Sequence, residues 1–289
     1  MRLLLIGRTG QLGGDLLRNG ESHEWIAPGR EALDVEHPDQ VRAAIADAKP
    51  DAVINCSAFH NVPMCEEQPE RAFRVNCVAM RDLARACAEA GTRLVTFSSD
   101  YVFGGERRTP YAEDDLPRPV QIYGISRLAG EHAVMAAAPA HAMVIRTCGL
   151  YGASGARSKG GNFVDGRVAD ARAGKTIEMA CEQVVAPTAT DDLSKAVLRL
   201  MAHPGATPGI YHLTSEGQCS WYEFTVAIVE AIGSAAKVVP VDRGGVTGSM
   251  RRPLYSVLAN TRARALGVTL PSWRESLRRY IDTKHAASA

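Results

Sequence analysis

The sequence of 289 residues lacks any apolar run that approaches the roughly 20 residues of a membrane-spanning helix. It also lacks an excess of charge, because 33 Lys and Arg face 32 Asp and Glu and the formal net charge is +1. That balance argues against nucleic acid or a membrane surface as the main partner. Hydrophobic residues at 46% and charged residues at 22% are typical of a globular chain, which excludes disorder as the dominant state.

The cysteines lack the spacing of a disulfide framework or a zinc site. Their number is odd, they are scattered, and no two form a Cys-x-x-Cys pair. Residues 1–7 resemble a signal peptide only superficially, because the apolar stretch from Leu3 to Ile6 is shorter than the ~7–15 residues of a secretory core. We interpret the cysteines as reduced thiols, mostly buried, and expect a cytoplasmic protein.

Apolar strands alternate with helices from the start of the chain. The predicted strands are residues 2–6, 24–27, 52–56, 94–97 and 142–146, and the predicted helices are residues 11–18, 39–48, 70–90 and 126–137. Short apolar strands that alternate with amphipathic helices are typical of a parallel sheet covered on both faces. The pattern therefore predicts an α/β protein with a doubly wound, parallel-sheet Rossmann fold.

The regular alternation of strands and helices ends after about residue 148. A loop is expected at 152–161, helices at 191–201, 221–232 and 272–284, and one more strand at 209–213. We expect residues 1–150 to form a dinucleotide-binding domain to which residues 185–215 return. Residues 151–184 and 216–289 are expected to form a smaller C-terminal lobe that binds the substrate.

Three glycines follow the first strand with the spacing Gly-x-x-Gly-x-x-Gly. Glycines between a strand and a helix allow a tight turn, so that backbone N–H groups and the helix N-terminus approach a pyrophosphate closely. The alternative is a turn that is only structural. The predicted cradle consists of Gly7, Arg8, Thr9, Gly10, Gln11, Leu12 and Gly13.

The residues after the second strand favour NADPH over NADH. An acidic residue at this point suits the ribose hydroxyls of NADH, whereas an arginine suits a 2′-phosphate. The strand is followed by Pro28-Gly29-Arg30, and Arg8 adds a second cation, although both arginines are also compatible with solvated surface charge. Leu33, Asp34 and Val35 are expected to pack on the adenine and hydrogen-bond it. NADH remains the alternative cofactor.

Reactive side chains are expected where successive strands end, which is the ligand edge of such sheets. The third strand ends at Cys56, Ser57 and Ala58, small residues beside which a cofactor can pass, and the fourth ends at Ser99. Tyr123 and Arg127 lie four residues apart and share one helix face. A fixed cation favours the phenolate, lowers the pKa of tyrosine and makes it a proton donor and acceptor, and Ser99 can bond the same substrate oxygen. Taken alone, such a pair is usually ordinary helix surface.

Together these motifs resemble the extended short-chain dehydrogenase/reductases, and within them the dTDP-4-dehydrorhamnose reductase family. The resemblance covers essentially the whole chain. It is carried by the glycine loop, Ser98-Ser99-Asp100-Tyr101-Val102-Phe103, Tyr123-Gly124-Ile125-Ser126-Arg127-Leu128-Ala129-Gly130-Glu131, residues 146–152, 162–164, 186–188, 209–212 and 220–224, and Arg252-Pro253-Leu254-Tyr255-Ser256-Val257-Leu258.

The resemblance implies an NADPH-dependent reduction of the C4 ketone of a nucleotide-linked 4-keto-6-deoxy sugar, dTDP-4-dehydro-L-rhamnose above all. It implies that Tyr123 protonates the developing alkoxide, that Ser99 polarises it, and that Arg127 holds the nicotinamide ribose. Asn76 is expected to support the cofactor side of the site. The implied substrate residues are Ser99, Asp100, Tyr101, Val102, Asn162, Trp221 and Arg252, although Trp221 is equally compatible with a core position.

The chain departs from the family pattern at the catalytic cation. The superfamily has Tyr-x-x-x-Lys, and Arg127 stands at the lysine position. Arginine keeps the charge but is larger, planar and not deprotonated, so a proton relay through an ammonium group is lost. Residues 61–66 are also less polar than is common in the family.

Two alternatives stay open at this stage. One is a non-catalytic NADP-binding subunit, such as the regulatory β subunit of methionine adenosyltransferase, and the other is a reductase for a different deoxysugar nucleotide. The resemblance also implies a homodimer, bridged in some members by Mg²⁺. No His, Cys or carboxylate spacing in the sequence indicates a metal site.

Overall fold

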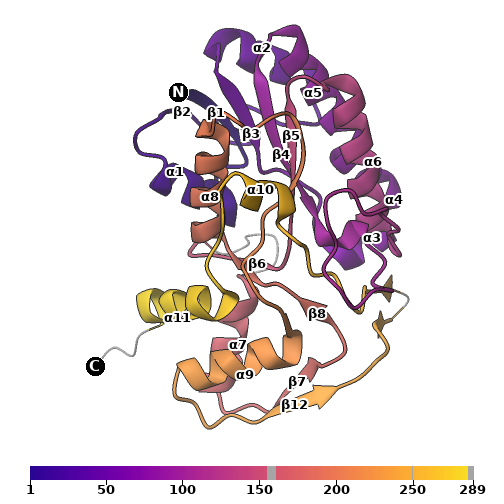
Figure 1. The fold of residues 1–289 in the computed structure, drawn as a ribbon, viewed down its shortest axis with the longest axis vertical. Coiled ribbons are helices and arrows are strands. Elements are labelled where there is room, and N and C mark those ends of the chain that lie inside the picture. The colour runs from indigo at the N-terminus through magenta and orange to yellow at the C-terminus, as the bar shows by residue number, and fades with distance from the viewer. Residues whose placement is uncertain (155–160, 249, 286–289) are drawn as a thin grey trace.

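The computed structural model describes residues 1–154, 161–248 and 250–285, and its centre is a six-stranded sheet (Figure 1). The strands are β1 (Arg2–Ile6), β2 (Glu24–Ile26), β3 (Ala52–Asn55), β4 (Arg93–Ser99), β5 (Ala142–Thr147) and β10 (Gly209–His212). They lie in the order β2, β1, β3, β4, β5, β10, and every neighbouring pair is parallel. The order changes direction between β1 and β3, and ligands of such sheets bind beyond the carboxyl ends of the strands at that point.

Helices cover both faces of the sheet (Figure 1). One face packs against α1 (Gln11–Asn19) and α8 (Thr190–Ala202), and the other against α2 (Pro38–Ala48), α5 (Ala79–Glu89) and α6 (Ile122–Ala137). Successive residues of a strand point to opposite faces. Accordingly Leu3 and Leu5 belong to the first core, whereas Leu4 and Ile6 belong to the second. The prediction of a doubly wound α/β fold is confirmed.

The helix predicted at 70–90 is continuous but irregular. It consists of α4 (Pro69–Phe73), a π-helical segment η1 (Arg74–Val78) and α5. Such π segments are rare and occur mostly at functional sites, and this one contains Asn76. The short helices α3 (Val62–Glu67) and η2 (Asp100–Val102) follow β3 and β4, and the sequence did not predict them.

The remainder of the chain forms a smaller assembly below the sheet (Figure 1). Its helices are α7 (Phe163–Arg172), α9 (Trp221–Ala231) and α11 (Trp273–Lys284), whereas the short helix α10 (Thr261–Ala265) packs against β10 and belongs to the core of the sheet. Its paired strands are β6 (Leu150–Tyr151) with β9 (Thr188–Ala189), β7 (Ile177–Ala180) with β12 (Val238–Val241), β8 (Val184–Val185) with β11 (Cys219–Ser220), and β13 (Val246–Thr247) with β14 (Met250–Arg251). An aromatic cluster around Phe224 and Trp273 forms the core. Of the loop predicted at 152–161, residues 155–160 lie outside the described residues.

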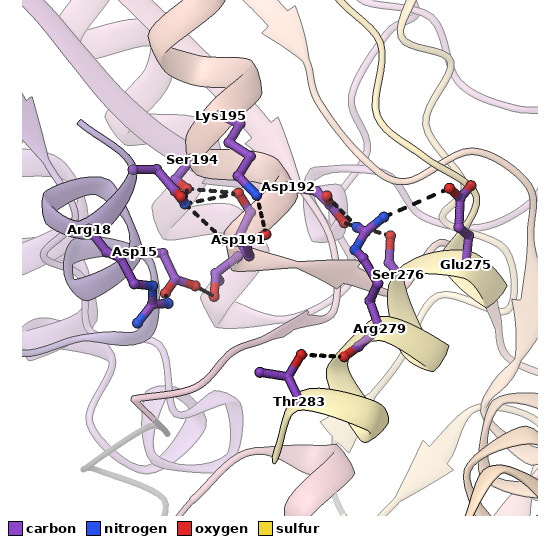
Figure 2. Close-up of polar contacts among 12 residues, drawn as sticks. Asp15, Arg18, Asp191, Asp192, Ser194, Lys195, Glu275, Ser276, Arg279 and Thr283 are labelled. Carbon is purple, nitrogen blue, oxygen red and sulfur yellow. Dashed lines mark hydrogen bonds and ion pairs between the residues drawn. The ribbon is translucent and has the colours of Figure 1, made fainter. Parts of the chain in front are cut away.

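Polar side chains of α8 connect the helix on one side to α1 and on the other to α11 (Figure 2). Asp192 is nearly buried, and its carboxylate accepts hydrogen bonds from Arg279 and from the hydroxyl of Ser276 at 2.6 Å. On the α1 side, the buried carboxylate of Asp15 accepts a 2.5 Å hydrogen bond from the hydroxyl of Thr190. Helix α8 therefore fixes the smaller assembly against the helix that follows the glycine loop.

A buried ion pair fixes α6 to the sheet. The guanidinium of Arg146 on β5 donates to both carboxylate oxygens of Glu131 on α6, at 2.7 Å from Nη2 and 2.9 Å from Nε. Both side chains are only 2% exposed.

Burial and the charge of Arg146 lower the pKa of the neighbouring His212 to about 3, so this histidine is neutral at physiological pH.

No helix in the described part of the chain is long and apolar enough to cross a membrane. All seven cysteines lie in that part, and they form no disulfide bond there. The same residues contain no group of three or more His, Cys, Asp or Glu side chains arranged to hold a metal ion.

We predict that Glu131→Gln lowers the free energy of unfolding by about 3 kcal/mol, because it leaves Arg146 charged and buried without an anion. Urea denaturation measures the change. The control is Glu24→Gln, which removes an exposed ion pair with Arg2 and should cost less than about 1 kcal/mol. Equal effects of the two substitutions would contradict the importance of the buried pair.

Candidate active site

The glycine loop between β1 and α1 is shaped for close contact with a ligand. Gly7 has φ of +89°, and a Cβ atom there would lie 3.1 Å from the carbonyl carbon of Cys56. A Cβ atom on Gly13 would lie 2.3 Å from the carbonyl oxygen of Gly7. The N-cap residue of α1, Gly10, supplies no side-chain cap, so the first N–H groups of the helix can bind an anion. This cradle fits the pyrophosphate of a dinucleotide.

A pocket extends from this loop along the ends of β1, β2 and β3. Of the predicted cofactor residues, Gly7, Arg8, Thr9, Arg30, Asp34, Val35, Ser57 and Ala58 line it. Leu33, predicted beside the adenine, lines it as well. The lining residues that the prediction did not include are Ile6, Pro28, Gly29, Glu36, Phe59, Arg71 and Val75. The guanidinium carbon Cζ of Arg71 lies 5.1 Å from the centroid of the Phe59 ring, over its face. The position of Arg71 at the start of the long helix could have identified it as a pocket residue, because that helix begins at the same edge of the sheet as the pocket.

Arg30 stands at the open side of this pocket. Its side chain is 69% exposed, and its Nε lies 2.9 Å from Asp34 Oδ2. Burial tends to raise the pKa of Asp34, but hydrogen bonds from the backbone N–H of Glu36 and from Arg30 lower it overall. The guanidinium is therefore held beside the pocket by carboxylates, with its solvent-facing side free to contact an added phosphate.

Ser99 and Tyr123 meet at the end of β4. Ser99 is the last residue of that strand, its Oγ accepts the backbone N–H of Tyr101 at 3.1 Å, and it also hydrogen-bonds the Tyr123 side chain. The ring of Tyr101 packs edge-on against Tyr123 with centroids 6.0 Å apart. Two hydroxyl groups are thus held together, as the reduction of a carbonyl group requires.

Burial controls the protonation of Tyr123. It raises the pKa of this tyrosine, while the charge of Arg127 and the hydrogen bond with Ser99 lower it by less. The sequence predicted that the cation brings the pKa down toward working pH. Arg127 acts in that direction, but the net shift is upward, so Tyr123 keeps its proton at neutral pH, which suits a proton donor.

Arg127 does not line the cofactor pocket but is connected to it through Asn76, which hydrogen-bonds the lining residue Phe59. Arg127 is 6% exposed, and its Nη1 lies 3.4 Å from Asn76 Oδ1. Among the described residues its buried Nε has no hydrogen-bond partner, which leaves a donor available for a ligand hydroxyl.

The side chain of Asn76 joins three parts of the site through hydrogen bonds. Its Nδ2 donates to the carbonyl oxygen of Phe59 at 2.9 Å and to Ser126 Oγ at 3.0 Å, and its Oδ1 accepts the N–H of Phe59 at 2.9 Å. Asn76 therefore connects the π segment, the pocket wall and α6. Its position suits a residue that supports the cofactor site through Phe59 and Arg127.

The predicted substrate residues fall into two groups. Arg252 reaches the site through Tyr101. Its Nη1 donates to the hydroxyl of Tyr101 at 2.9 Å, and Tyr101 contacts both Ser99 and Tyr123. The side chains of the other predicted substrate residues make mainly internal contacts. Val102 is fully buried, and Asp100 is buried and hydrogen-bonded to Ser99. Asn162 caps the N-terminus of α7, and Trp221 packs on Phe163 with ring centroids 4.6 Å apart.

Comparison with known proteins identifies close relatives. The model of the RmlD substrate binding domain family matches residues 1–286. The dTDP-4-dehydrorhamnose reductase of Mycolicibacterium smegmatis is 37% identical over 281 residues, which cover 96% of this chain and 84% of that protein.

Two solved structures share the fold over nearly their full length. The dTDP-4-dehydrorhamnose reductase of Clostridium acetobutylicum has a TM-score of 0.91 and 34% identity, with 99% of this chain and 100% of that chain covered. The Bacillus anthracis dTDP-4-dehydrorhamnose reductase in complex with NADP has a TM-score of 0.91 and 30% identity, with 98% and 99% covered.

We predict that Arg30→Ala weakens NADPH binding by about 10- to 100-fold, because a charge-assisted hydrogen bond to a phosphate contributes about 1.5–3 kcal/mol. NADH lacks this phosphate, so its affinity should change by less than about threefold on the same grounds. Fluorescence titration with both cofactors measures the two effects. Arg42→Ala, which removes an exposed arginine of α2, is the control. Equal losses for NADPH and NADH would contradict the role of Arg30.

We predict that Arg127→Lys lowers kcat by about tenfold, because the buried space and the Asn76 contact fit a planar guanidinium rather than a single ammonium group. Steady-state kinetics at saturating NADPH measure the change. A large gain in kcat would instead mean that the arginine is a handicap to which the pocket has not adapted.

Proposed function

The chain belongs to the RmlD substrate binding domain family and is an NADPH-dependent sugar-nucleotide ketoreductase, and we propose that its substrate is dTDP-4-dehydro-L-rhamnose. The single observation that carries the proposal is the meeting of Ser99 and Tyr123 at the end of β4, the neighbour of β3, after which Ser57, Ala58 and Phe59 line the cofactor pocket. The family comparison supports the choice of sugar, because it supplies relatives named for this substrate.

Each residue has a distinct role in the proposed mechanism. The bound dinucleotide supplies a hydride to C4 of the sugar. Ser99 and Tyr123 bind the carbonyl oxygen at C4, and Tyr123 gives its proton to that oxygen as negative charge develops on it. Arg127 holds the ribose next to the nicotinamide and stabilises the tyrosinate that remains. The buried Nε of Arg127 and the cradle around Gly7 fit this assignment.

We assign the two parts of the chain to the two ligands. Residues 1–150 together with 185–215 bind the cofactor, which agrees with the position of β10 in the sheet and of α8 on α1. Residues 151–184 and 216–289 bind the sugar nucleotide, with Arg252 facing the site through Tyr101. Cysteines that form no disulfide further support a cytoplasmic location. The family resemblance supports a homodimer, which light scattering on the purified protein tests.

The substrate is tested by the loss of NADPH absorbance with dTDP-4-keto-6-deoxyglucose, in the presence and absence of the 3,5-epimerase that converts it to the L-lyxo sugar. Turnover that requires the epimerase supports dTDP-4-dehydro-L-rhamnose. Equal turnover without the epimerase would redirect the proposal to a different 4-keto sugar. Confirmed NADPH binding without turnover of either sugar would contradict it.

We predict that Tyr123→Phe lowers kcat at least about 100-fold, because the reaction loses its proton donor. The phenyl ring keeps the packing with Tyr101, so NADPH affinity should stay within about threefold. Single-turnover kinetics and fluorescence titration separate the two effects. Undiminished turnover would refute Tyr123 as the acid.

A further inference from the structure

Asp100 follows Ser99 directly, and its carboxyl group is buried without a cation. The residue is 3% exposed. Ser99 Oγ lies 2.8 Å from its Oδ1, Ser256 Oγ lies 2.5 Å from its Oδ2, and the thiol of Cys148 also hydrogen-bonds the carboxyl group. In the described part of the chain, the side chains that hydrogen-bond Asp100 are therefore all neutral hydroxyl or thiol groups.

This environment favours the protonated form of Asp100. A charge in a buried site is costly unless a counter-charge compensates it. Burial raises the pKa of Asp100, and the hydrogen bonds from Ser256, Cys148 and Ser99 lower it by less.

The groups that face Asp100 from neighbouring elements do not supply a counter-charge. Tyr101 of η2, Tyr123 of α6 and Cys148 after β5 each interact with its charge, and burial keeps all three protonated. Two arginines of the site bond other groups, Arg252 the hydroxyl of Tyr101 and Arg127 the side chain of Asn76.

The direction of the hydrogen bonds depends on this proton. If Asp100 carries it on Oδ1, the acid donates to Ser99 Oγ, which also accepts the backbone N–H of Tyr101 at 3.1 Å. Both acceptor positions of the Ser99 hydroxyl are then filled, so its own proton points away from Asp100, toward Tyr123 and the substrate oxygen. If Asp100 is ionised, Ser99 donates to the carboxylate instead and accepts from Tyr123, and both protons turn away from the substrate.

We propose that Asp100 is a positioning residue that works as a neutral carboxylic acid, donating to Ser99 and so directing the hydroxyl protons of Ser99 and Tyr123 toward the carbonyl oxygen of the substrate. The inference rests on the proposed function for its catalytic meaning. Ser256, from the conspicuous stretch Arg252–Leu258, donates to the other oxygen and fixes the orientation of the acid.

Infrared spectroscopy tests the protonation without any substrate. The difference spectrum between the wild-type protein and Asp100→Asn at neutral pH should show the C=O stretch of a protonated carboxylic acid, with a shift in D₂O. A difference spectrum in which the substitution removes only carboxylate bands, and no C=O band of a protonated acid, would overturn the inference. This readout is independent of turnover.

Kinetics test the consequence with NADPH and dTDP-4-dehydro-L-rhamnose. Asp100→Ala should lower kcat at least about tenfold, and Asp100→Asn should restore most of it, because the amide can donate to Ser99 as the acid does. The acid form is the active one, so wild-type kcat should fall as pH rises through the pKa of Asp100. That fall should be absent from Asp100→Asn, whose profile keeps only the later fall from Tyr123.

Two further variants sharpen the result. Ser256→Ala should move the fall in kcat to higher pH, because the Ser256 hydroxyl stabilises the charged form of Asp100. Asp39→Asn, at an exposed position of α2, should keep the wild-type profile. An Asp100→Asn variant as inactive as Asp100→Ala, or one with the wild-type profile, would overturn the inference. If the wild type reduces neither 4-keto sugar, the proposed function fails, and the infrared result alone decides the state of Asp100.

Discussion

The close contact of helix α6 with the segments around it is the constraint on which the active site depends. A Cβ atom on Gly124 would lie 2.0 Å from the carbonyl oxygen of Tyr101, and one on Gly130 would lie 2.0 Å from that of Asn76. Only glycine permits this approach, because any side chain would push the helix off η2 and η1. The contact with η2 brings Tyr123 to Ser99, the contact with η1 brings Arg127 to Asn76, and the ion pair of Glu131 and Arg146 fixes the helix to β5.

Burial has one consistent chemical effect within this arrangement. It raises the pKa of Tyr101 to about 12 and also raises the pKa values of Tyr123, Asp100 and Cys148. Tyr101, Tyr123 and Cys148 therefore hold their protons at neutral pH, and the upward shift of Asp100 is in the direction of the neutral acid that we propose. A site rich in protonated donors suits the reduction of a ketone, in which the developing oxyanion needs both hydrogen bonds and a proton. The positive charge of Arg127 lowers the pKa of Tyr123, so in the proposed mechanism it stabilises the tyrosinate left after proton transfer.

The fold was accessible from the sequence because its strands are continuous apolar runs and its helices have clear amphipathic spacing. The glycine loop was accessible for the same reason, since its three glycines lie between such a strand and such a helix. Pairs of two-residue strands such as β6 and β9 carry no periodicity, and the π segment around Asn76 has the composition of an ordinary helix. The contact between Asp100 and Ser256 joins positions 156 residues apart, so no local pattern predicts it, and only the structure shows that the carboxyl group lacks a cation. The chemical roles of the site residues remain predictions.

The central claim is that this arrangement delivers a hydride to the sugar and a proton to its oxygen. The most direct measurement uses NADPH deuterated at the transferable position of the nicotinamide, with the epimerase-generated L-lyxo 4-keto sugar nucleotide as substrate. The product sugar is then analysed by NMR and mass spectrometry. The account predicts one deuterium at C4 of the product sugar and its loss from the cofactor. Bound cofactor that retains its deuterium, with no labelled sugar formed, would contradict the account.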